Sequence, residues 1–356
     1  MVGFPPTYIG PVGALDRFER VCTQGLDDRA LRVALLAELR RHVRFDAHAW
    51  LLTDPETWVG TAPLAEIPSL DDLPRLVRTK YLTSTNRWTS LPPNEASTLV
   101  VATAGERSRS RMWSELLAGY GIDDVASVVF RDQLGCWAFL DLWRRDGSFT
   151  AGDCATLEAL ARVVTPALRR SLAATFIVDE RADPPHGEPV VLLLDDDLQP
   201  LTQTPQTDTY LRALLPTEAD RSPVPAGAYN AAAQLLASEQ DIDAHPPWAR
   251  VHLRDGHWVT ISAARMVGTA RQSGAIAVTI EATSPAARTA LYARVIGLTE
   301  RETELLGLVV GGSDTRAIAR RLFVSEHTVH DHLKSVFAKA DTHSRRVLAA
   351  RATGAR

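Results

Sequence analysis

The sequence lacks several features that identify whole classes of protein. No run of apolar residues approaches the roughly 18 that a membrane-spanning helix needs. The first ten residues contain no basic stretch followed by an apolar segment, so they do not have the pattern of a secretory signal. Together these absences predict a cytoplasmic protein with no membrane partner.

Cysteine is scarce, and catalytic motifs are missing. Cys22, Cys136 and Cys154 are scattered and odd in number, which fits neither a disulfide framework nor a zinc-ligand spacing. The chain has no nucleophile elbow, no Walker-type phosphate loop and no dinucleotide-binding glycine loop. The sequence therefore predicts a protein that is not an enzyme and has no catalytic residues, metal or cofactor.

Lysine is nearly absent, because only Lys80, Lys334 and Lys339 occur among 39 basic residues. A net charge of −4 argues against a chain that binds nucleic acid over its whole surface. The part from Gly297 onward nevertheless has ten basic and seven acidic residues, against 29 basic and 36 acidic in the remainder. This mildly basic C-terminal part, with two of the three lysines, is compatible with contacts to phosphates.

Residues 14–178 have the pattern of an α+β module. Apolar positions at helical spacing alternate with β-rich runs, two of which are separated by a short hairpin loop. The predicted elements are helices within 14–44, 112–119 and 150–174, and strands over 45–53, 98–103, 125–131 and 136–144. The last hairpin and helix resemble the end of GAF-like domains, which implies a GAF-like sensor module.

GAF-like domains often bind small ligands, so the resemblance implies a ligand pocket. Four large aromatic residues of the predicted strands are candidates to line it: Trp50, Trp137, Phe139 and Trp143. Aromatic side chains that alternate along strands also pack the cores of ordinary sheets, and this alternative stays open. The sequence does not identify a ligand.

A proline-rich break at 181–189 precedes a second module, predicted over 188–284. Its elements follow the order of two strands, small helices and three strands, which resembles PAS-like domains. The predicted elements are strands over 190–194 and 198–203, helices over 206–214 and 228–239, a strand pair around Asp255-Gly256, and a strand over 275–281.

An acidic turn, Asp195 to Asp197, offers a different interpretation of this module. Response-regulator receiver domains also begin with an apolar strand followed by paired acids. Phosphoryl transfer in such a domain needs a cation, which receivers supply with a lysine, and no lysine lies between Lys80 and Lys334. A phosphorelay regulator with a degenerate receiver is therefore the weaker alternative.

After a predicted helical linker at 285–297, the sequence predicts four short helices over 298–356. Thr299 and Glu302 form a capping box, and Asp314 and Ser325 are N-caps for the second and third helices. In the third helix the apolar positions Val329, Leu333, Val336, Phe337 and Ala340 share one side. A short helix, a tight turn and a capped amphipathic helix predict a helix-turn-helix.

The motifs LTxRExExLxLVxxG, IAxxLxxSexTVxxHLK and SR in this stretch resemble the LuxR-type DNA-binding domain. The fold class is thus predicted to be multidomain α+β, with a GAF-like module, a PAS-like module and an all-α four-helix domain. The resemblance implies DNA contacts from residues of the second, third and fourth helices: Thr315, Arg316, Ser325, His327, Thr328, His330, Asp331, Lys334, Lys339 and Arg345. It also implies that the fourth helix pairs two subunits on a palindromic site, through Val347, Leu348 and Arg351.

The expected function is a bacterial transcription regulator that binds double-stranded DNA as a homodimer, with RNA polymerase as a further expected partner and the upstream modules in control. Three alternatives concern the C-terminal domain: a helix-turn-helix used only for protein contacts, a sigma-factor region, and a metal site. The last would use four histidines, His327, His330, His332 and His343, but no convergent set is predicted.

Overall fold

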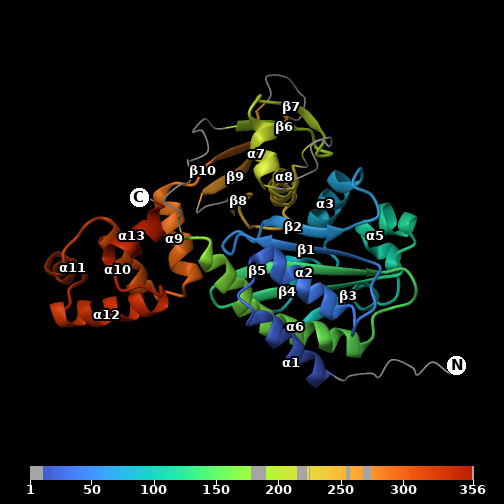
Figure 1. Ribbon diagram of the computed structural model, residues 1–356. Coiled ribbons are helices and arrows are strands. Elements are labelled where there is room, and N and C mark those ends of the chain that lie inside the picture. Colours follow the sequence, from blue (N-terminus) through green and yellow to red (C-terminus); the bar gives the residue numbers. More distant parts are fainter. Residues whose placement is uncertain are drawn as a thin grey trace. The chain divides into compact units, whose positions relative to one another are not determined.

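The computed structural model describes residues 11–177, 190–214, 223, 225–253, 257–267 and 274–354. The chain divides into two compact units (Figure 1). The first unit contains the described residues up to Leu168 together with Val190–Val251 and Ile261–Ile280. The second contains the described residues of Arg169–Pro189, His252–Thr260 and Glu281–Arg356. No helix among the described residues is long and apolar enough to cross a membrane.

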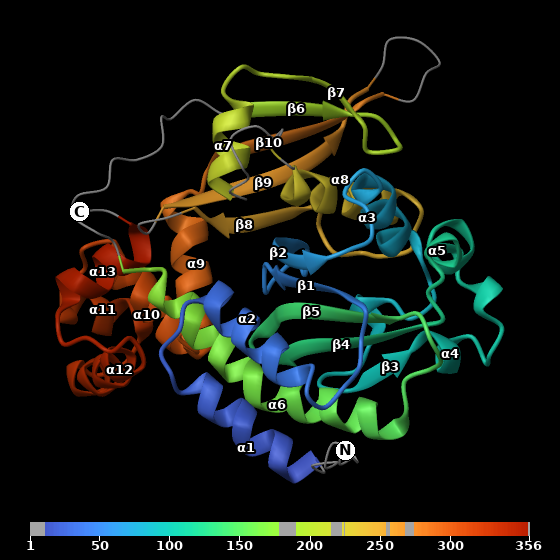
Figure 2. The ribbon, with the colours of Figure 1, turned by 45° about the vertical axis from the view of Figure 1, so that its right-hand side comes forward.

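The first unit begins with a five-stranded antiparallel sheet of order β2-β1-β5-β4-β3. Helices α1, α2 and α6 lie along one face of this sheet, and α3 lies over the other face (Figure 2). The strands are β1 (Ala47–Thr53), β2 (Gly60–Glu66), β3 (Ala96–Thr98), β4 (Asp124–Asp132) and β5 (Gly135–Arg144). The helices are α1 (Pro11–Cys22), α2 (Asp28–Leu39), α3 (Leu73–Leu82), α4 (Leu99–Ala102), α5 (Arg111–Glu115) and α6 (Ala151–Ala174).

The predicted hairpin is confirmed as β4 and β5, whose strands extend until Asp132 pairs with Gly135. Almost every residue of β5 is buried, because helices cover the sheet on both faces. The predicted strand over 98–103 is wrong beyond its first residue. The Thr98 hydroxyl accepts a hydrogen bond from the backbone N–H of Val101 at 3.2 Å, and this N-cap turns the chain into α4.

The first unit also contains most of a second antiparallel sheet, of order β7-β6-β10-β9-β8; His252 of β8, the first three residues of β9 and the last two of β10 belong to the second unit. In both sheets the five strands, numbered along each segment, lie in the order second, first, fifth, fourth, third. The elements are β6 (Val190–Leu194), β7 (Pro200–Gln203), α7 (Thr207–Leu214), α8 (Ala226–Glu239), β8 (Trp248–His252), β9 (Trp258–Arg265) and β10 (Ile276–Ala282). The predicted break at 181–189 and the predicted Asp255-Gly256 turn lie outside the described residues.

The antiparallel pairing of β6 with β10 contradicts the receiver interpretation, since receiver domains are built on a parallel sheet. The acidic turn has a structural role instead. The Asp195 carboxylate accepts hydrogen bonds from the backbone N–H groups of Asp197 at 2.9 Å and Gln199 at 2.8 Å. These bonds fix the reversal between β6 and β7.

Buried ion pairs join the two sheets of the first unit. Arg250 of β8 donates from Nε to Asp54, directly after β1, at 2.7 Å, and both side chains are nearly inaccessible to solvent. Arg87 pairs in the same way with Asp243 at 2.7 Å. In each pair the opposite charge compensates for the hydration that both groups lose on burial. The two ion pairs therefore hold the two sheets against each other.

The C-terminal part of the second unit is entirely helical and agrees with the four predicted helices and the helix before them. The helices are α9 (Pro285–Val295), α10 (Glu300–Val310), α11 (Thr315–Leu322), α12 (Glu326–Lys339) and α13 (Arg345–Thr353). A mixed α/β protein with a separate helical domain at its C-terminal end is thus confirmed.

Candidate functional site

Side-chain caps define the ends of the helices around α12, as the sequence predicts. Thr299 and Glu302 make the reciprocal bonds of a capping box at the start of α10. Asp314 accepts from the N–H of Ala317 at 2.7 Å and begins α11. Ser325 accepts from the N–H of Thr328 at 3.1 Å and begins α12. Only Phe323 and Val324 separate the end of α11 from the Ser325 cap, which is the tight turn of a helix-turn-helix.

Helix α12 has one buried and one exposed face. Val329, Leu333, Val336 and Ala340 are buried, and Phe337 is half-buried, as the helical spacing predicts. On the other side the exposed residues are His327, His330, Asp331, Lys334 and Ala338. The buried stripe fixes the rotation of the helix about its axis, so the polar face is presented to solvent.

Three of the predicted DNA-contacting residues line one shallow depression beside this face, together with Leu333, Phe337, Ala338 and His343. His330 and Lys334 line it from α12, and Arg345 lines it from the start of α13. Arg345 donates from Nη2 to the hydroxyl of Thr315 at 2.8 Å, which joins the first turns of α13 and α11. Ser325 and Thr328 are 2.9 Å apart through their hydroxyls at the start of α12. Arg316 is exposed in the first turn of α11.

The surface is not uniformly basic. His327 Nε2 lies 3.7 Å from the Asp331 carboxylate, with both side chains largely exposed at 88% and 67%. A long, exposed contact of this kind contributes little to stability. The Asp331 carboxylate is therefore available as a hydrogen-bond acceptor at the surface of α12.

Glu302 has a role that the sequence does not reveal. Besides its part in the capping box, its carboxylate accepts from Ser335 and from the Lys339 ammonium, both at 2.6 Å. Burial would raise the pKa of Glu302, but the bonds from Lys339, Ser335 and Thr299 together lower that pKa to about 2. Glu302 thus anchors α12 to the start of α10, and the spacing of Ser335 and Lys339 one helical turn apart was the available signal.

The predicted subunit contacts of α13 divide into one exposed and two internal residues. Leu348 is completely buried within the helical domain, so its placement in a subunit interface is corrected to a core position. Arg351 donates to the carbonyl oxygen of Ala340 at 2.7 Å and thereby caps the end of α12. Val347, with 40% of its surface exposed, is the one of the three that faces solvent.

Three of the four histidines considered as a metal site, His327, His330 and His343, are exposed, and His332 is half-buried. Across the described part of the chain, no group of three or more His, Cys, Asp or Glu residues is placed to hold a metal ion.

The four aromatic residues predicted to line a pocket in the first sheet have different surroundings. Trp50 stacks on Phe130 with 5.2 Å between ring centroids, and the Trp137 indole donates to Asp132 at 3.0 Å. Phe139 stacks on Trp88 at 4.8 Å. These three predicted residues are buried: Trp50 and Phe139 pack against other rings, and Trp137 is held by its hydrogen bond. Trp143 lines a cavity between α3 and the first sheet.

The side chains that share this cavity with Trp143 include Lys80, Trp88 and Asp141, none of which we predicted. Lys80 is the only lysine before residue 334 in an arginine-rich chain, which was a usable signal. Trp88 and Asp141 gave no comparable signal in the sequence.

Comparison with known families identifies the helical domain. Residues 297–352 match the family described as "Bacterial regulatory proteins, luxR family". This stretch contains α10 to α12 and most of α13, and so the geometry above is that of a LuxR-family helix-turn-helix. No curated protein matches the chain.

Solved structures give a weaker likeness. Escherichia coli SdiA is 12% identical, with 97% of this chain and 96% of that chain covered and a TM-score of 0.37. The bacteriophytochrome RpBphP3 of R. palustris is 13% identical, with 75% and 61% covered and a TM-score of 0.31. SdiA in complex with octanoyl-rac-glycerol is 11% identical, with 98% and 90% covered and a TM-score of 0.25. At these scores the likeness does not assign either sheet to a named fold.

Proposed function

Because residues 297–352 form a LuxR-family helix-turn-helix, the chain carries the DNA-binding domain of a transcription regulator, and we propose how it uses that domain. Helix α12 enters the major groove of double-stranded DNA and presents His330, Asp331 and Lys334 to the base edges. Two subunits bind together on a palindromic site. The GAF-like and PAS-like modules upstream, over 14–178 and 188–284, control this binding. Residues 285–297 link these modules to the DNA-binding domain.

The observation that carries the proposal is the two-sided character of α12. Every apolar residue that the helical spacing places on one side is buried, except Phe337, which is half-buried. Its opposite side offers a lysine, two histidines and an aspartate with no apolar residue larger than alanine. A protein-binding face would need an apolar centre, whereas base edges and phosphates are contacted by polar and charged groups.

Of the predicted DNA-contacting residues, those at the starts of the helices are proposed to contact phosphates. Thr315, Arg316 and Arg345 lie at or next to helix starts, where backbone N–H groups and side chains can meet the same phosphate. Ser325 and Thr328 offer hydroxyls at the start of α12. Lys339 is engaged by the buried Glu302 carboxylate, so we assign it to the positioning of α12 and not to a phosphate.

Control by the upstream modules is supported by contacts of α9 inside the second unit. Arg288 donates to the carbonyl oxygens of Phe176, at the end of the α6 segment, and Arg351 of α13, at 3.4 and 3.2 Å. Its guanidinium also lies 4.8 Å from the Phe176 ring centroid. One side chain thus touches both the chain that leaves the first module and the helix proposed to pair subunits.

The test uses the full-length chain and DNA sites selected from a random library. Lys334→Ala should weaken binding: by about 1–3 kcal/mol with relaxed specificity if Lys334 meets a base, or uniformly with a salt slope smaller by about one if it meets a phosphate. Arg109→Ala removes the same charge from an exposed position of the first module and should change neither affinity nor slope.

The proposal is wrong if Lys334→Ala and His330→Ala together leave affinity, specificity and salt slope unchanged. Subunit pairing is tested separately, by comparing binding to a palindrome with binding to one of its halves. Equal affinity for the two would contradict a dimer on DNA.

A further inference from the structure

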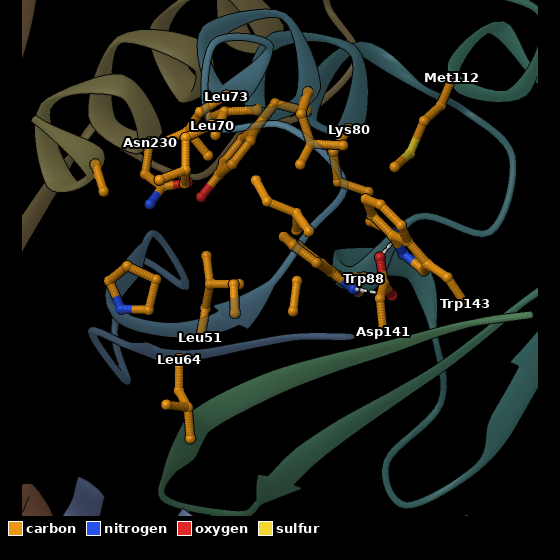
Figure 3. Close-up of a pocket in the computed structure, with 18 of the residues that line it drawn as sticks. Leu51, Leu64, Leu70, Leu73, Lys80, Trp88, Met112, Asp141, Trp143 and Asn230 are labelled. Carbon is orange, nitrogen blue, oxygen red and sulfur yellow. Dashed lines mark hydrogen bonds and ion pairs between the residues drawn. The ribbon is translucent and has the colours of Figure 1, made fainter. Parts of the chain in front are cut away.

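A partly open, mainly apolar cavity of about 260 Å³ lies between α3 and the first sheet (Figure 3). It is larger than engineered cavities of about 150 Å³ that hold benzene, so it can take a molecule of more than one ring. Most of its lining is aliphatic or aromatic: Ala49, Leu51, Leu64, Ile67, Leu73, Leu76, Val77, Tyr81, Trp88 and Met112 among others. A lining of this kind with a few polar groups is typical of small-molecule sites.

Two buried polar atoms in the lining have no hydrogen-bond partner. The indole nitrogen of Trp143 is unpaired, although this residue is only 1% exposed. The amide oxygen of Asn230 is also unpaired, at 2% exposure. Leaving such a group buried without a partner costs about 1–3 kcal/mol, so a ligand that pairs with either atom would recover part of that cost. Figure 3 shows Asn230 and Trp143 on opposite sides of the space.

The charges in the cavity wall are already balanced. Asp141 accepts from the Lys80 ammonium at 2.8 Å and from the Trp88 indole at 2.8 Å. Its Oδ1 also accepts from the Ser127 hydroxyl at 2.5 Å. Arg29, the other cationic residue of the lining, is exposed, so an anionic group could meet it only at the solvent-exposed part of the lining. Among the buried residues a charged ligand would find no uncompensated partner, and burying its charge there would be costly.

The residues that line the cavity come from the segments of both sheets of the first unit. Ala226 and Asn230 come from α8, which follows the second sheet's first strands, whereas the rest of the lining comes from residues before 144. Gly60 permits the close approach of α8, because a Cβ at Gly60 would lie 3.3 Å from the Asn230 side chain. An occupant therefore touches both predicted sensor modules at once.

We propose that this cavity binds an uncharged, mainly apolar small molecule that accepts a hydrogen bond from the Trp143 indole and donates one to the Asn230 amide oxygen. The inference extends the proposed control by the upstream modules. Binding of the molecule does not depend on that proposal; only its effect on DNA binding rests on the proposed function. Binding satisfies both unpaired atoms and ties α8 to the first sheet.

The probe is Prodan, a neutral naphthalene ketone whose carbonyl can accept from Trp143 and whose fluorescence shifts to the blue in apolar sites. Titration of the full-length protein should give saturable binding. Trp143→Phe keeps an aromatic ring but removes the indole N–H donor, and should weaken Prodan binding about three- to tenfold. The anionic dye 8-anilinonaphthalene-1-sulfonate should compete at least about tenfold more weakly, since its sulfonate has no partner inside.

A matched pair of substitutions locates the binding. Ala65 is exposed at the cavity rim, so Ala65→Trp can obstruct entry without disturbing the core. Ala102→Trp makes the same change at an exposed position outside the lining and should leave binding intact. Thermal unfolding of each variant confirms that it is folded.

The inference is overturned if Prodan shows no saturable binding to the wild type, or if Ala65→Trp or Trp143→Phe binds it as tightly. It is equally overturned if the sulfonate dye displaces Prodan at equal concentration. DNA binding measured on the same preparations separates the two proposals: intact DNA binding without Prodan binding rejects the cavity alone. Prodan binding without DNA binding rejects the proposed function alone.

Discussion

At the scale of single residues, we expect Asp331 to limit how tightly α12 approaches DNA. Its exposed carboxylate lies on the face that also carries His330 and Lys334. An acid there repels phosphates, yet it can accept a hydrogen bond from the amino group of cytosine. Affinity and sequence preference should therefore respond in opposite directions to its removal.

Asp331→Asn should raise the affinity for random DNA about fivefold, because two like charges a few ångströms apart in water repel by about 1 kcal/mol. Discrimination at one base position should fall. Selection from a random library and titration at two salt concentrations measure both effects. Asp341→Asn is the control: it makes the same charge change at an exposed site beyond α12, at a positive φ that asparagine tolerates. A lower affinity of Asp331→Asn for random DNA would contradict this role.

A second residue-scale prediction concerns Glu302 and pH. Its pKa is lowered from 4.5 to about 2 in the folded protein, so the stability it contributes is present above about pH 4.5. That contribution, about 3 kcal/mol by linkage, is lost as the pH falls from about 4.5 to 2. Urea unfolding of the helical domain in the full chain should show this loss.

Glu302→Gln should flatten the acid dependence between those pH values, because the group no longer titrates. Glu304→Gln, at an exposed position of the same helix, should retain the wild-type profile. If the stability of Glu302→Gln and of the wild type changed equally with pH, the proposed role of Glu302 in holding α12 would be contradicted.

At the scale of elements, the turn between α11 and α12 contains a strained residue. Phe323 has a φ of 54° and is 94% exposed, so its ring contributes little packing in the described structure. The left-handed conformation costs a residue with a Cβ roughly 1–2 kcal/mol relative to glycine, part of which the greater freedom of unfolded glycine offsets.

Phe323→Gly should therefore raise the unfolding free energy by about 0.5–1 kcal/mol, measured by thermal or urea unfolding. Ala338→Gly, at an exposed helical position of α12, should lower it by about 1 kcal/mol. Destabilisation by Phe323→Gly would mean that the ring makes contacts beyond those of one chain, or that the turn depends on it.

At the scale of the whole molecule, buried ion pairs are expected to make the two sheets of the first unit unfold cooperatively. Arg250 and Asp54 are 2% and 0% exposed, and Arg250 also pairs at 2.9 Å with Glu56, whose side chain is 44% exposed, so neutralising Asp54 removes the buried part of the compensation of Arg250. The sequence predicts two modules, but these pairs predict that both sheets unfold in one transition.

Asp54→Asn should lower the stability of the first unit by about 3–5 kcal/mol while keeping a single transition for both sheets. Urea unfolding followed by tryptophan fluorescence and by circular dichroism measures it. Asp146→Asn breaks an exposed pair with Arg44 and should cost less than about 1 kcal/mol. Two separate transitions in the wild type would contradict the coupling.

Local patterns in the sequence were enough for the helical domain and for most strands. Thr299, Asp314 and Ser325 cap helices through bonds to residues three positions away, so their roles can be predicted without the fold. The two-sided pattern of α12 and the β4–β5 hairpin are local in the same sense. The strand predicted beyond Thr98 is wrong because one cap outweighed the strand propensity of its neighbours.

What only the tertiary structure decided are contacts between residues far apart in the chain. Whether Leu348 faces a partner or the core depends on which helices cover α13, and it is covered. Whether Trp50 or Trp143 lines a cavity depends on which rings and helices lie above each face of the sheet. The Lys80–Asp141 and Arg250–Asp54 pairs join positions 61 and 196 residues apart, and no periodicity in the sequence encodes such partners. The sequence by itself determined the helix-turn-helix and the two faces of α12; long-range packing decided what holds α12 in place and where a cavity lies in the first unit.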